Sequence, residues 1–257
     1  PDGKFFFAMG ATSDSLVYWN RDADTGALTN QVNLIDKTNL DAVWGGTVSP
    51  DGKNVYVAAA ASNSIVYWDR DTTTGALSNQ VNLKDSTNLY YAKCVVVSPD
   101  GKNVYVAANL GHAIVYFDRD LATGALSNQI NLKDTTNLYY AFDMVISADG
   151  KNLYVASLGF DGIVYFERDQ TTGALTNQVN LKDSINLDYV LCVTVSPDGK
   201  NVYAGGYTSK TIVTWDRNTE TGALTNQVNE VTSVNFFGGL EVSSDGKNLY
   251  AADRNSP

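Results

Sequence analysis

The sequence predicts an all-β fold, a β-propeller of five blades with four antiparallel strands in each. Two observations carry this prediction. The whole chain is built from near-identical repeats of 49 residues, and each repeat holds four short segments with the composition of β-strands. Repeats of this length with four strands are typical of propeller blades. No segment keeps the 3.6-residue period of a helix, so we expect no helix longer than about two turns.

The repeat is marked by the string Asp-Gly-Lys, preceded by Pro, Ala or Ser. This string recurs at intervals of 49 residues, except for a last interval of 47. A second string, Thr-Gly-Ala-Leu, occurs once in every full unit. We therefore expect one domain over residues 1–257. Its units are 1–49, 50–98, 99–147, 148–196 and 197–243, with a partial unit at 244–257.

Within one unit, the four strands follow from the residue types. Residues 54–60 and 64–70 are rich in β-branched and aromatic side chains and predict the second and third strands of a blade. Residues 77–83 alternate apolar and polar side chains, which favours a half-exposed outer strand. The short apolar run 95–98 predicts an inner strand, and the Pro-Asp-Gly turn follows it at 99–101.

A large aromatic residue recurs at one position of every third strand. We expect these side chains to be buried between blades, where truncation of one would cost about 3–5 kcal/mol. They are Trp19, Trp68, Phe117, Phe166 and Trp215.

The two ends of the chain both carry a copy of the second strand, at 5–10 and 248–252. A five-bladed ring would close if the inner strand at 240–243 paired with residues 5–10. The C-terminal copy is then redundant, and three explanations stay open: it packs outside, it pairs with another molecule, or the chain is a piece of a longer one. With neither an initiator Met nor a signal peptide, the chain is expected to be a mature or trimmed product.

Two strings, VSPDGKNVYVAA at residues 48–59 and SNSIVYWDRDTTTGALS at residues 62–78, resemble the repeat of the lactonase-type, YVTN-like propellers. That group includes 6-phosphogluconolactonase-like enzymes with seven blades and many bacterial surface proteins. The resemblance implies the scaffold alone. Separately, we expect an extracellular or cell-surface location. No catalytic motif of those enzymes maps onto this chain, so the resemblance assigns no catalytic residue.

Composition excludes several classes of function. Lys and Arg number 18 against 28 for Asp and Glu, and a net charge of −10 disfavours nucleic acid as a partner. No apolar run approaches the roughly 20 residues of a membrane span. A single His disfavours His-based catalysis, and we expect no metal and no cofactor. Cys94 and Cys192 stand at one repeat position in separate units, and we expect two free, buried thiols.

The repeats diverge mainly in two windows, the loop between second and third strands and the connection from outer to inner strand. Eleven aromatic residues outside the repeated positions gather within or beside these windows. Aromatic rings with a polar edge suit sugars and protein partners, although the Tyr pairs would equally fill space between blades. The predicted ligand-binding residues are Trp44, Tyr90, Tyr91, His112, Tyr139, Tyr140, Phe160, Asp188, Tyr189 and Tyr207.

Two carboxylates, Asp143 and Glu241, lie at or beside predicted inner strands. Such a pair could act in general acid–base catalysis or bind a cation. They belong to units three and five, and the sequence does not fix the distance between them.

Near-identical blades with variable loops favour a noncatalytic binding propeller, lectin-like and secreted, with a glycan or a protein as its ligand. Two alternatives stay open. A redundant strand and Asn-rich outer strands would suit a structural or self-assembling surface protein. The family resemblance would suit a lactonase-like hydrolase.

Overall fold

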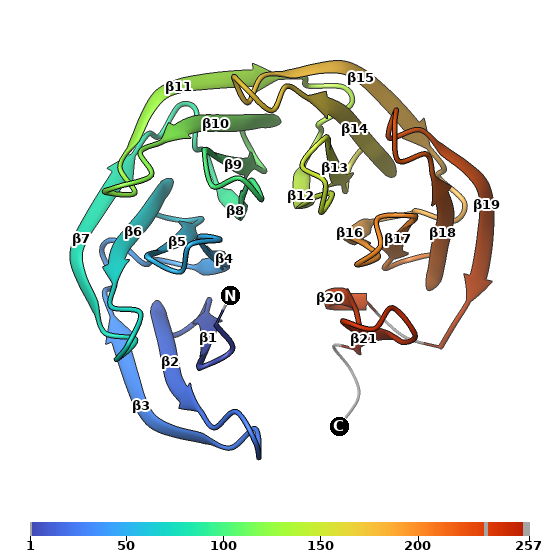
Figure 1. Cartoon of the computed structure of the whole chain (residues 1–257). Helices are drawn as coiled ribbons and strands as arrows, with labels where there is room; N and C mark the ends of the chain where they lie inside the picture. Colours follow the sequence, from blue (N-terminus) through green and yellow to red (C-terminus); the bar gives the residue numbers. More distant parts are fainter. Residues whose placement is uncertain (1, 234–235, 254–257) are drawn as a thin grey trace. The chain divides into compact units, whose positions relative to one another are not determined.

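The computed structural model describes residues 2–233 and 236–253, and these form an all-β structure of 21 strands in six sheets (Figure 1). Contacts divide the chain into two compact units. Unit 1 comprises Pro1–Gly111 and Val115–Asn131, and unit 2 comprises His112–Ile114 and Leu132–Pro257. Within residues 2–233 and 236–253, no helix is long and apolar enough to cross a membrane.

Unit 1 holds a three-stranded sheet in the order β1-β2-β3, a four-stranded sheet in the order β4-β5-β6-β7 and most of the sheet β8-β9-β10-β11. The first eleven strands are β1 (Phe5–Gly10), β2 (Ser15–Arg21), β3 (Leu28–Ile35), β4 (Val43–Val48), β5 (Asn54–Ala59), β6 (Ser64–Arg70), β7 (Leu77–Lys84), β8 (Ala92–Val97), β9 (Asn103–Ala108), β10 (Ala113–Arg119) and β11 (Leu126–Lys133).

Unit 2 holds the four-stranded sheets β12-β13-β14-β15 and β16-β17-β18-β19 and the two-stranded sheet β20-β21. Its strands are β12 (Ala141–Ile146), β13 (Asn152–Ser157), β14 (Gly162–Arg168), β15 (Leu175–Lys182), β16 (Val190–Val195), β17 (Asn201–Gly206), β18 (Thr211–Arg217), β19 (Leu224–Val231), β20 (Phe236–Val242) and β21 (Leu249–Asp253). The blade order from inner to outer strand, predicted from the repeat, is confirmed in each four-stranded sheet.

The predicted closure is wrong. β20 pairs with β21, and β1 pairs with β2, so residues 248–252 are the partner of the inner strand rather than a redundant copy. Local sequence explains the difference, because the Asp-Gly-Lys turn that joins β20 to β21 is the same hairpin that joins every other inner strand to its second strand. Ser243 and Gly246 close it with a backbone hydrogen bond of 2.8 Å.

In unit 1, a buried arginine at the end of a third strand links its sheet to the preceding sheet of the same unit. The Arg119 guanidinium donates to the hydroxyl of Tyr56 (2.8 Å), the carbonyl of Gly101 (3.0 Å), the side-chain oxygen of Asn54 (2.6 Å) and both carboxylate oxygens of Asp51 (3.1 Å). We call this arrangement the arginine latch. Its hydrogen bonds satisfy a charge that would otherwise be costly to bury.

The same latch recurs in unit 2, where Arg217 contacts Tyr154, Gly199, Asn152 and Asp149. The tyrosine hydroxyl also donates to a backbone carbonyl, that of the glycine in the Thr-Gly turn after the latch arginine. Tyr56 donates to Gly124 at 2.6 Å, and Tyr154 donates to Gly222 at 2.7 Å. Burial raises the pKa of both tyrosines to about 12, so each hydroxyl keeps the proton that it donates.

The latch of the first sheet is different. Arg70 donates to Gly52 and Asp2, but phenylalanines stand where the later latches have asparagine and tyrosine. The Phe5 ring lies 4.6 Å from the Arg70 guanidinium carbon. Phe7 offers no hydroxyl, and the Nε atom of Arg70 is buried without a hydrogen-bond partner.

The third-strand aromatics form the core as predicted, with one exception. Trp68, Phe117, Phe166 and Trp215 are at most 3% exposed. Trp19 is only half-buried and lies against Phe6. Trp68 packs in a cluster with residues of the first and second sheets. Trp19 belongs to the first sheet of unit 1, which has no preceding sheet in that unit to cover it.

Candidate functional site

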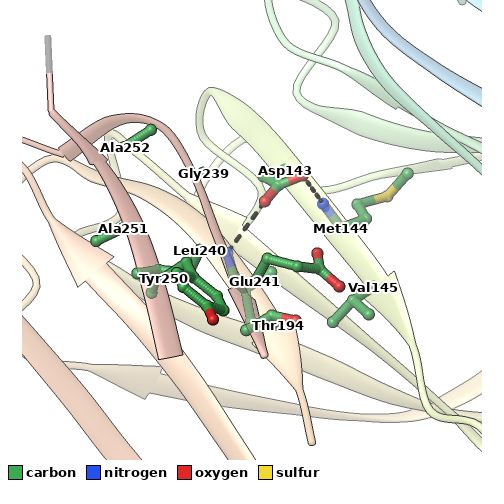
Figure 2. Close-up of a pocket in the computed structure, with 11 residues that line it drawn as sticks. Asp143, Met144, Val145, Thr194, Gly239, Leu240, Glu241, Tyr250, Ala251 and Ala252 are labelled. Atoms are coloured by element: carbon green, nitrogen blue, oxygen red, sulfur yellow. Dashed lines mark hydrogen bonds between the residues drawn. The ribbon is translucent and has the colours of Figure 1, made fainter. Parts of the chain in front are cut away.

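The cavity that best combines reactive side chains lies in unit 2, where the inner strand β16 is flanked by β12 and β20. Its volume is about 560 Å³. Figure 2 shows its lining, which comes from β12, β16, β20 and β21. The lining residues are Asp143, Met144, Val145, Val193, Thr194, Gly239, Leu240, Glu241, Tyr250, Ala251 and Ala252.

Asp143 is held by two backbone donors. One carboxylate oxygen accepts the N–H of Met144 at 2.9 Å, and the other accepts the N–H of Val193 on the neighbouring strand at 3.0 Å (Figure 2). The pairing of β12 with β13 shifts register between Ala141 and Asp143, as at a β-bulge, so Asp143 lies directly after an irregularity of the strand. These two donors, from β12 and β16, hold the carboxylate in place at the cavity.

Glu241 extends into the same cavity from β20 (Figure 2). Its side chain is exposed, and within the described residues no group donates a hydrogen bond to it. The structure thus brings together the two carboxylates that the sequence named from separate units. Nothing in their spacing along the chain shows this, because it depends on β16 lying between β12 and β20 (Figure 1).

Hydroxyl groups and a glycine complete the lining. Thr194 and Tyr250 bring their hydroxyls to the cavity from β16 and β21, positions that sequence reasoning did not select. Gly239 has a φ of 143°, a conformation that L side chains rarely adopt, and a Cβ atom there would project into open space. The irregular pairing of β20, between Phe236 and Leu240, places this glycine at the cavity.

The two cysteines are free, as predicted. Cys192 is 1% exposed beside the cavity. Burial, and then the negative charge of Asp143, raises the pKa of its thiol well above the usual range, which disfavours a nucleophilic thiolate. Cys94 is half-buried rather than buried as predicted.

The predicted ligand-binding residues fall into separate groups. In unit 1, the Lys93 ammonium lies 3.2 Å from the ring centre of Trp44 and 4.8 Å from that of Tyr91. Burial lowers the pKa of Lys93 to about 8. Sequence reasoning missed this lysine, since it stands at a position where other repeats carry apolar residues.

In unit 2, His112, Tyr139 and Tyr140 form an aromatic cluster with ring centres 4.3–5.1 Å apart. His112 accepts the backbone N–H of Tyr140 at its Nδ1 atom (3.2 Å). Asn63 and Asp161 accept the corresponding N–H groups of Tyr91 and Tyr189 in their own repeats. This loop position therefore supplies an acceptor to a backbone with positive φ, which gives His112 a local structural role.

Exposure separates the predicted residues further. Tyr90, Tyr139 and Tyr189 are 45%, 37% and 51% exposed, whereas Phe160 is buried at 7%. Asp188 and Tyr207 are half-buried. Their loops are joined by two backbone hydrogen bonds, in which the N–H of Tyr207 donates to the carbonyl of Tyr189 and the N–H of Thr208 donates to that of Asp188. Phe160 packs against Gly162 and beneath the ammonium of Lys182, which explains its burial. Their assignment to ligand binding stays a prediction.

Metal ligands do not gather in the part of the chain that the structure describes. No group of three His, Cys, Asp or Glu side chains in that part could hold a metal ion. The polar side chains that line the cavity are two carboxylates, Asp143 and Glu241, and two hydroxyls, Thr194 and Tyr250.

A family model described as "Lactonase, 7-bladed beta-propeller" matches residues 46–138 and 131–237 of the chain. No significant relative was found among the curated proteins. The family model has more blades than the five predicted from the number of repeats.

Solved structures resemble the chain over most of its length. A candidate 6-phosphogluconolactonase from Bacteroides fragilis has a TM-score of 0.79 and 20% identity, covering 99% of this chain and 75% of that protein. Another candidate 6-phosphogluconolactonase, from Bacteroides uniformis, has a TM-score of 0.72 and 20% identity, covering 90% and 69%. The periplasmic gluconolactonase of Pseudomonas aeruginosa has a TM-score of 0.71 and 17% identity, covering 90% and 68%. At such identities these likenesses show the fold alone.

The family match overturns the prediction of a noncatalytic, lectin-like and secreted binding propeller. The near-identity of the blades had favoured repeated binding pockets over one asymmetric catalytic site. The inner strands carry the asymmetry instead, since Asp143 and Glu241 have no carboxylate counterpart at the same positions of the other repeats.

Proposed function

Because the chain belongs to the lactonase family of seven-bladed β-propellers, we propose that it hydrolyses lactones at the cavity lined by β12, β16, β20 and β21. The observation that carries this proposal is the convergence of Asp143 and Glu241 on one cavity. One carboxylate is fixed by backbone donors and the other has no partner in the described part of the chain. That difference suits two different roles in one reaction.

Glu241 acts as the general base. Its carboxylate takes a proton from a water molecule while the water oxygen bonds to the carbonyl carbon of the lactone. The tetrahedral intermediate then loses the bond between that carbon and the ring oxygen. The proton passes from Glu241 to the ring oxygen, and the product is an open-chain hydroxy acid.

The remaining groups position the substrate. Asp143, with both oxygens fixed, accepts hydrogen bonds from hydroxyl groups of the lactone. The hydroxyls of Thr194 and Tyr250 are the side-chain donors of the lining, and they stabilise the negative charge that develops on the carbonyl oxygen. Gly239 presents backbone without a side chain to the cavity, at a φ of 143° that L side chains rarely adopt.

We place this activity outside the cytoplasm. The gluconolactonase of Pseudomonas aeruginosa, one of the structural neighbours, is periplasmic.

The test is acid release at constant pH from glucono-1,5-lactone, galactono-1,4-lactone and γ-butyrolactone. The wild-type protein should accelerate ring opening of at least one lactone over the spontaneous rate. Glu241→Gln should lower kcat/KM about 100-fold or more, the usual contribution of a general base. Glu230→Gln, an exposed residue on β19 outside the cavity, is the matched control and should keep full activity. Equal activity of the two variants would contradict the proposal.

A further inference from the structure

The imidazole of His112, directly before β10, holds the backbone that leads into β12. Its Nδ1 atom accepts the N–H of Tyr140 at 3.2 Å. Tyr140 has a φ of 58°, in the left-handed region that residues other than glycine rarely adopt, so its conformation depends on the contacts around it. β12 begins at the next residue, Ala141, and Asp143 follows at the cavity. His112 thus fixes the chain just before one carboxylate of the candidate site.

The same segment is held from another side by the loop that follows β13. The carbonyl of Tyr139 accepts the N–H of Gly159 at 2.9 Å. The carbonyl of Tyr140 accepts the N–H of Leu158 at 3.1 Å. The Tyr139 ring lies against Gly159, where a Cβ atom would collide with it. The backbone before Asp143 is therefore held between two anchors, and release of either one gives it freedom to move.

The anchor at His112 differs from its counterparts in chemistry. Asn63 and Asp161, at the same repeat position, accept the equivalent backbone N–H groups through side-chain oxygens. Amide oxygens and carboxylates accept hydrogen bonds throughout the neutral range, whereas an imidazole gains a proton near pH ~6.5. A proton on Nδ1 would point at the N–H of Tyr140, so two donors would face each other. The hydrogen bond is then lost.

Two phenols, a carboxylate and an ammonium lie around this imidazole. The rings of Tyr139 and Tyr140 are 4.7 and 5.1 Å from it, and the hydrogen bond with Tyr139 raises the pKa of the Tyr140 hydroxyl. Asp134 donates its backbone N–H to the carbonyl of His112 at 3.0 Å. Burial opposes the charge of Asp134, but hydrogen bonds from its own turn and from β15 outweigh burial and lower its pKa to about 2. Lys133 beside it is exposed. A change of charge in this cluster near neutral pH therefore comes from the imidazole.

We propose that His112 is a positioning residue for Asp143 and makes the lactone site sensitive to pH, a role that rests on the proposed function. With a neutral imidazole, Nδ1 holds Tyr140, and Asp143 keeps its place at the cavity. With a protonated imidazole, the segment is released at Tyr140, and the positioning of substrate by Asp143 weakens. Activity is present above about pH 6.5, where an unperturbed imidazole is neutral, and falls below it.

The first test is the pH dependence of kcat/KM for a lactone that the protein hydrolyses, with the spontaneous rate subtracted at each pH. From about pH 8 to about pH 5, the wild-type value should fall about tenfold or more with a midpoint near ~6.5. His112→Asn keeps an acceptor, as Asn63 does, but takes no proton, so this titration should be missing. Asn63→His, the reverse change in the loop before β8, is the matched control and should keep the wild-type profile.

The second test needs no activity and uses the single His of the chain. Nuclear magnetic resonance of the ¹⁵N-labelled protein should show the neutral imidazole with its proton on Nε2. The amide signal of Asp143 should shift with the same midpoint as the imidazole signals. In His112→Asn, the Asp143 signal should stay in place over the same range.

Two results would overturn the proposal. One is the same titration of kcat/KM in the wild-type protein and in His112→Asn. The other is an amide signal of Asp143 that does not follow the titration of His112. If no lactone is hydrolysed at any pH, the proposed function fails, and the Asp143 signal alone decides whether His112 positions that residue. Thermal unfolding at each pH separates a change in the site from loss of the folded state.

Discussion

The arginine latches and the inner strands occupy fixed places in the repeat, yet they have diverged to different extents. Arg119 and Arg217 make the same contacts with the same residue types in separate sheets. On the inner strands, the position of Asp143 carries cysteine or glycine in the other repeats, and that of Glu241 carries threonine or valine. Identity among repeats thus marks what every sheet needs to pack, and divergence marks the cavity where carboxylates converge.

The latch of Arg70 sharpens this comparison because its residue types differ from those of the Arg119 and Arg217 latches. Phe7 occupies the place of Tyr56, and its ring lies 5.5 Å from that of Tyr18, as the Tyr56 ring lies 5.4 Å from that of Tyr67. The ring packing is therefore kept and only the hydroxyl is missing. The consequence is the orphaned Nε atom of Arg70.

The largest effect on stability is expected from removal of a complete latch. Arg217→Met should lower the free energy of unfolding by about 3–5 kcal/mol, because it leaves a partly buried carboxylate and buried acceptors without their partner. Chemical denaturation followed by tryptophan fluorescence measures this.

Arg21→Met is the matched control for that substitution. Arg21 has the same repeat position, but it is exposed, and among the described residues its guanidinium donates only to the carbonyl of Gly3, at 3.1 Å. Its replacement should change stability by less than about 0.5 kcal/mol. Equal losses in the two variants would break the account of the latch.

A smaller effect is expected from loss of one hydroxyl. Tyr56→Phe should cost about 1–3 kcal/mol, since it leaves the Nε atom of Arg119 buried without an acceptor, as in the first latch. Thermal and urea unfolding report the loss. Tyr90→Phe, which removes an exposed hydroxyl, should be neutral, and a comparable cost there would assign the effect to something other than the latch.

The smallest effect has the opposite sign. Phe7→Tyr should raise the free energy of unfolding by about 1 kcal/mol, because the new hydroxyl accepts from Arg70 and donates to the carbonyl of Gly75. The urea midpoint should move upwards at constant slope. Destabilisation would show that the first sheet cannot place a hydroxyl where the later sheets do.

Most of the fold follows from the sequence, because the repeat fixes the number and order of strands in each sheet. The sequence shows that the residues at the positions of Arg21 and Asp2 recur in every full unit. It does not show that an arginine pairs with the aspartate of a preceding unit, as Arg70 does with Asp2. The side-chain acceptors of Arg119 lie 63–68 residues before it in the chain, in the preceding sheet. The closure was mispredicted for a related reason. Residues 5–10 and 248–252 are both copies of the second strand, and the hairpin that joins β20 directly to β21 decides which of them pairs with β20.

The candidate site was less accessible from sequence. Asp143 and Glu241 could be named as carboxylates on inner strands, but their convergence required the placement of β12 and β20 on either side of β16. The variable loops were predicted to bind a ligand because aromatic residues gather in them. In the structure, His112 serves as a backbone acceptor and Phe160 is buried, so residue type alone did not reveal what each side chain contacts.

One paired measurement tests the central claim most directly. Lactone hydrolysis and the free energy of unfolding are measured on the same preparations of Glu241→Gln and Tyr154→Phe. The account predicts that Glu241→Gln loses about 100-fold or more in rate with stability unchanged to within about 0.5 kcal/mol. Tyr154→Phe should lose about 1–3 kcal/mol of stability and keep its rate. Loss of activity in Tyr154→Phe at full folding, or full activity in Glu241→Gln, would contradict it.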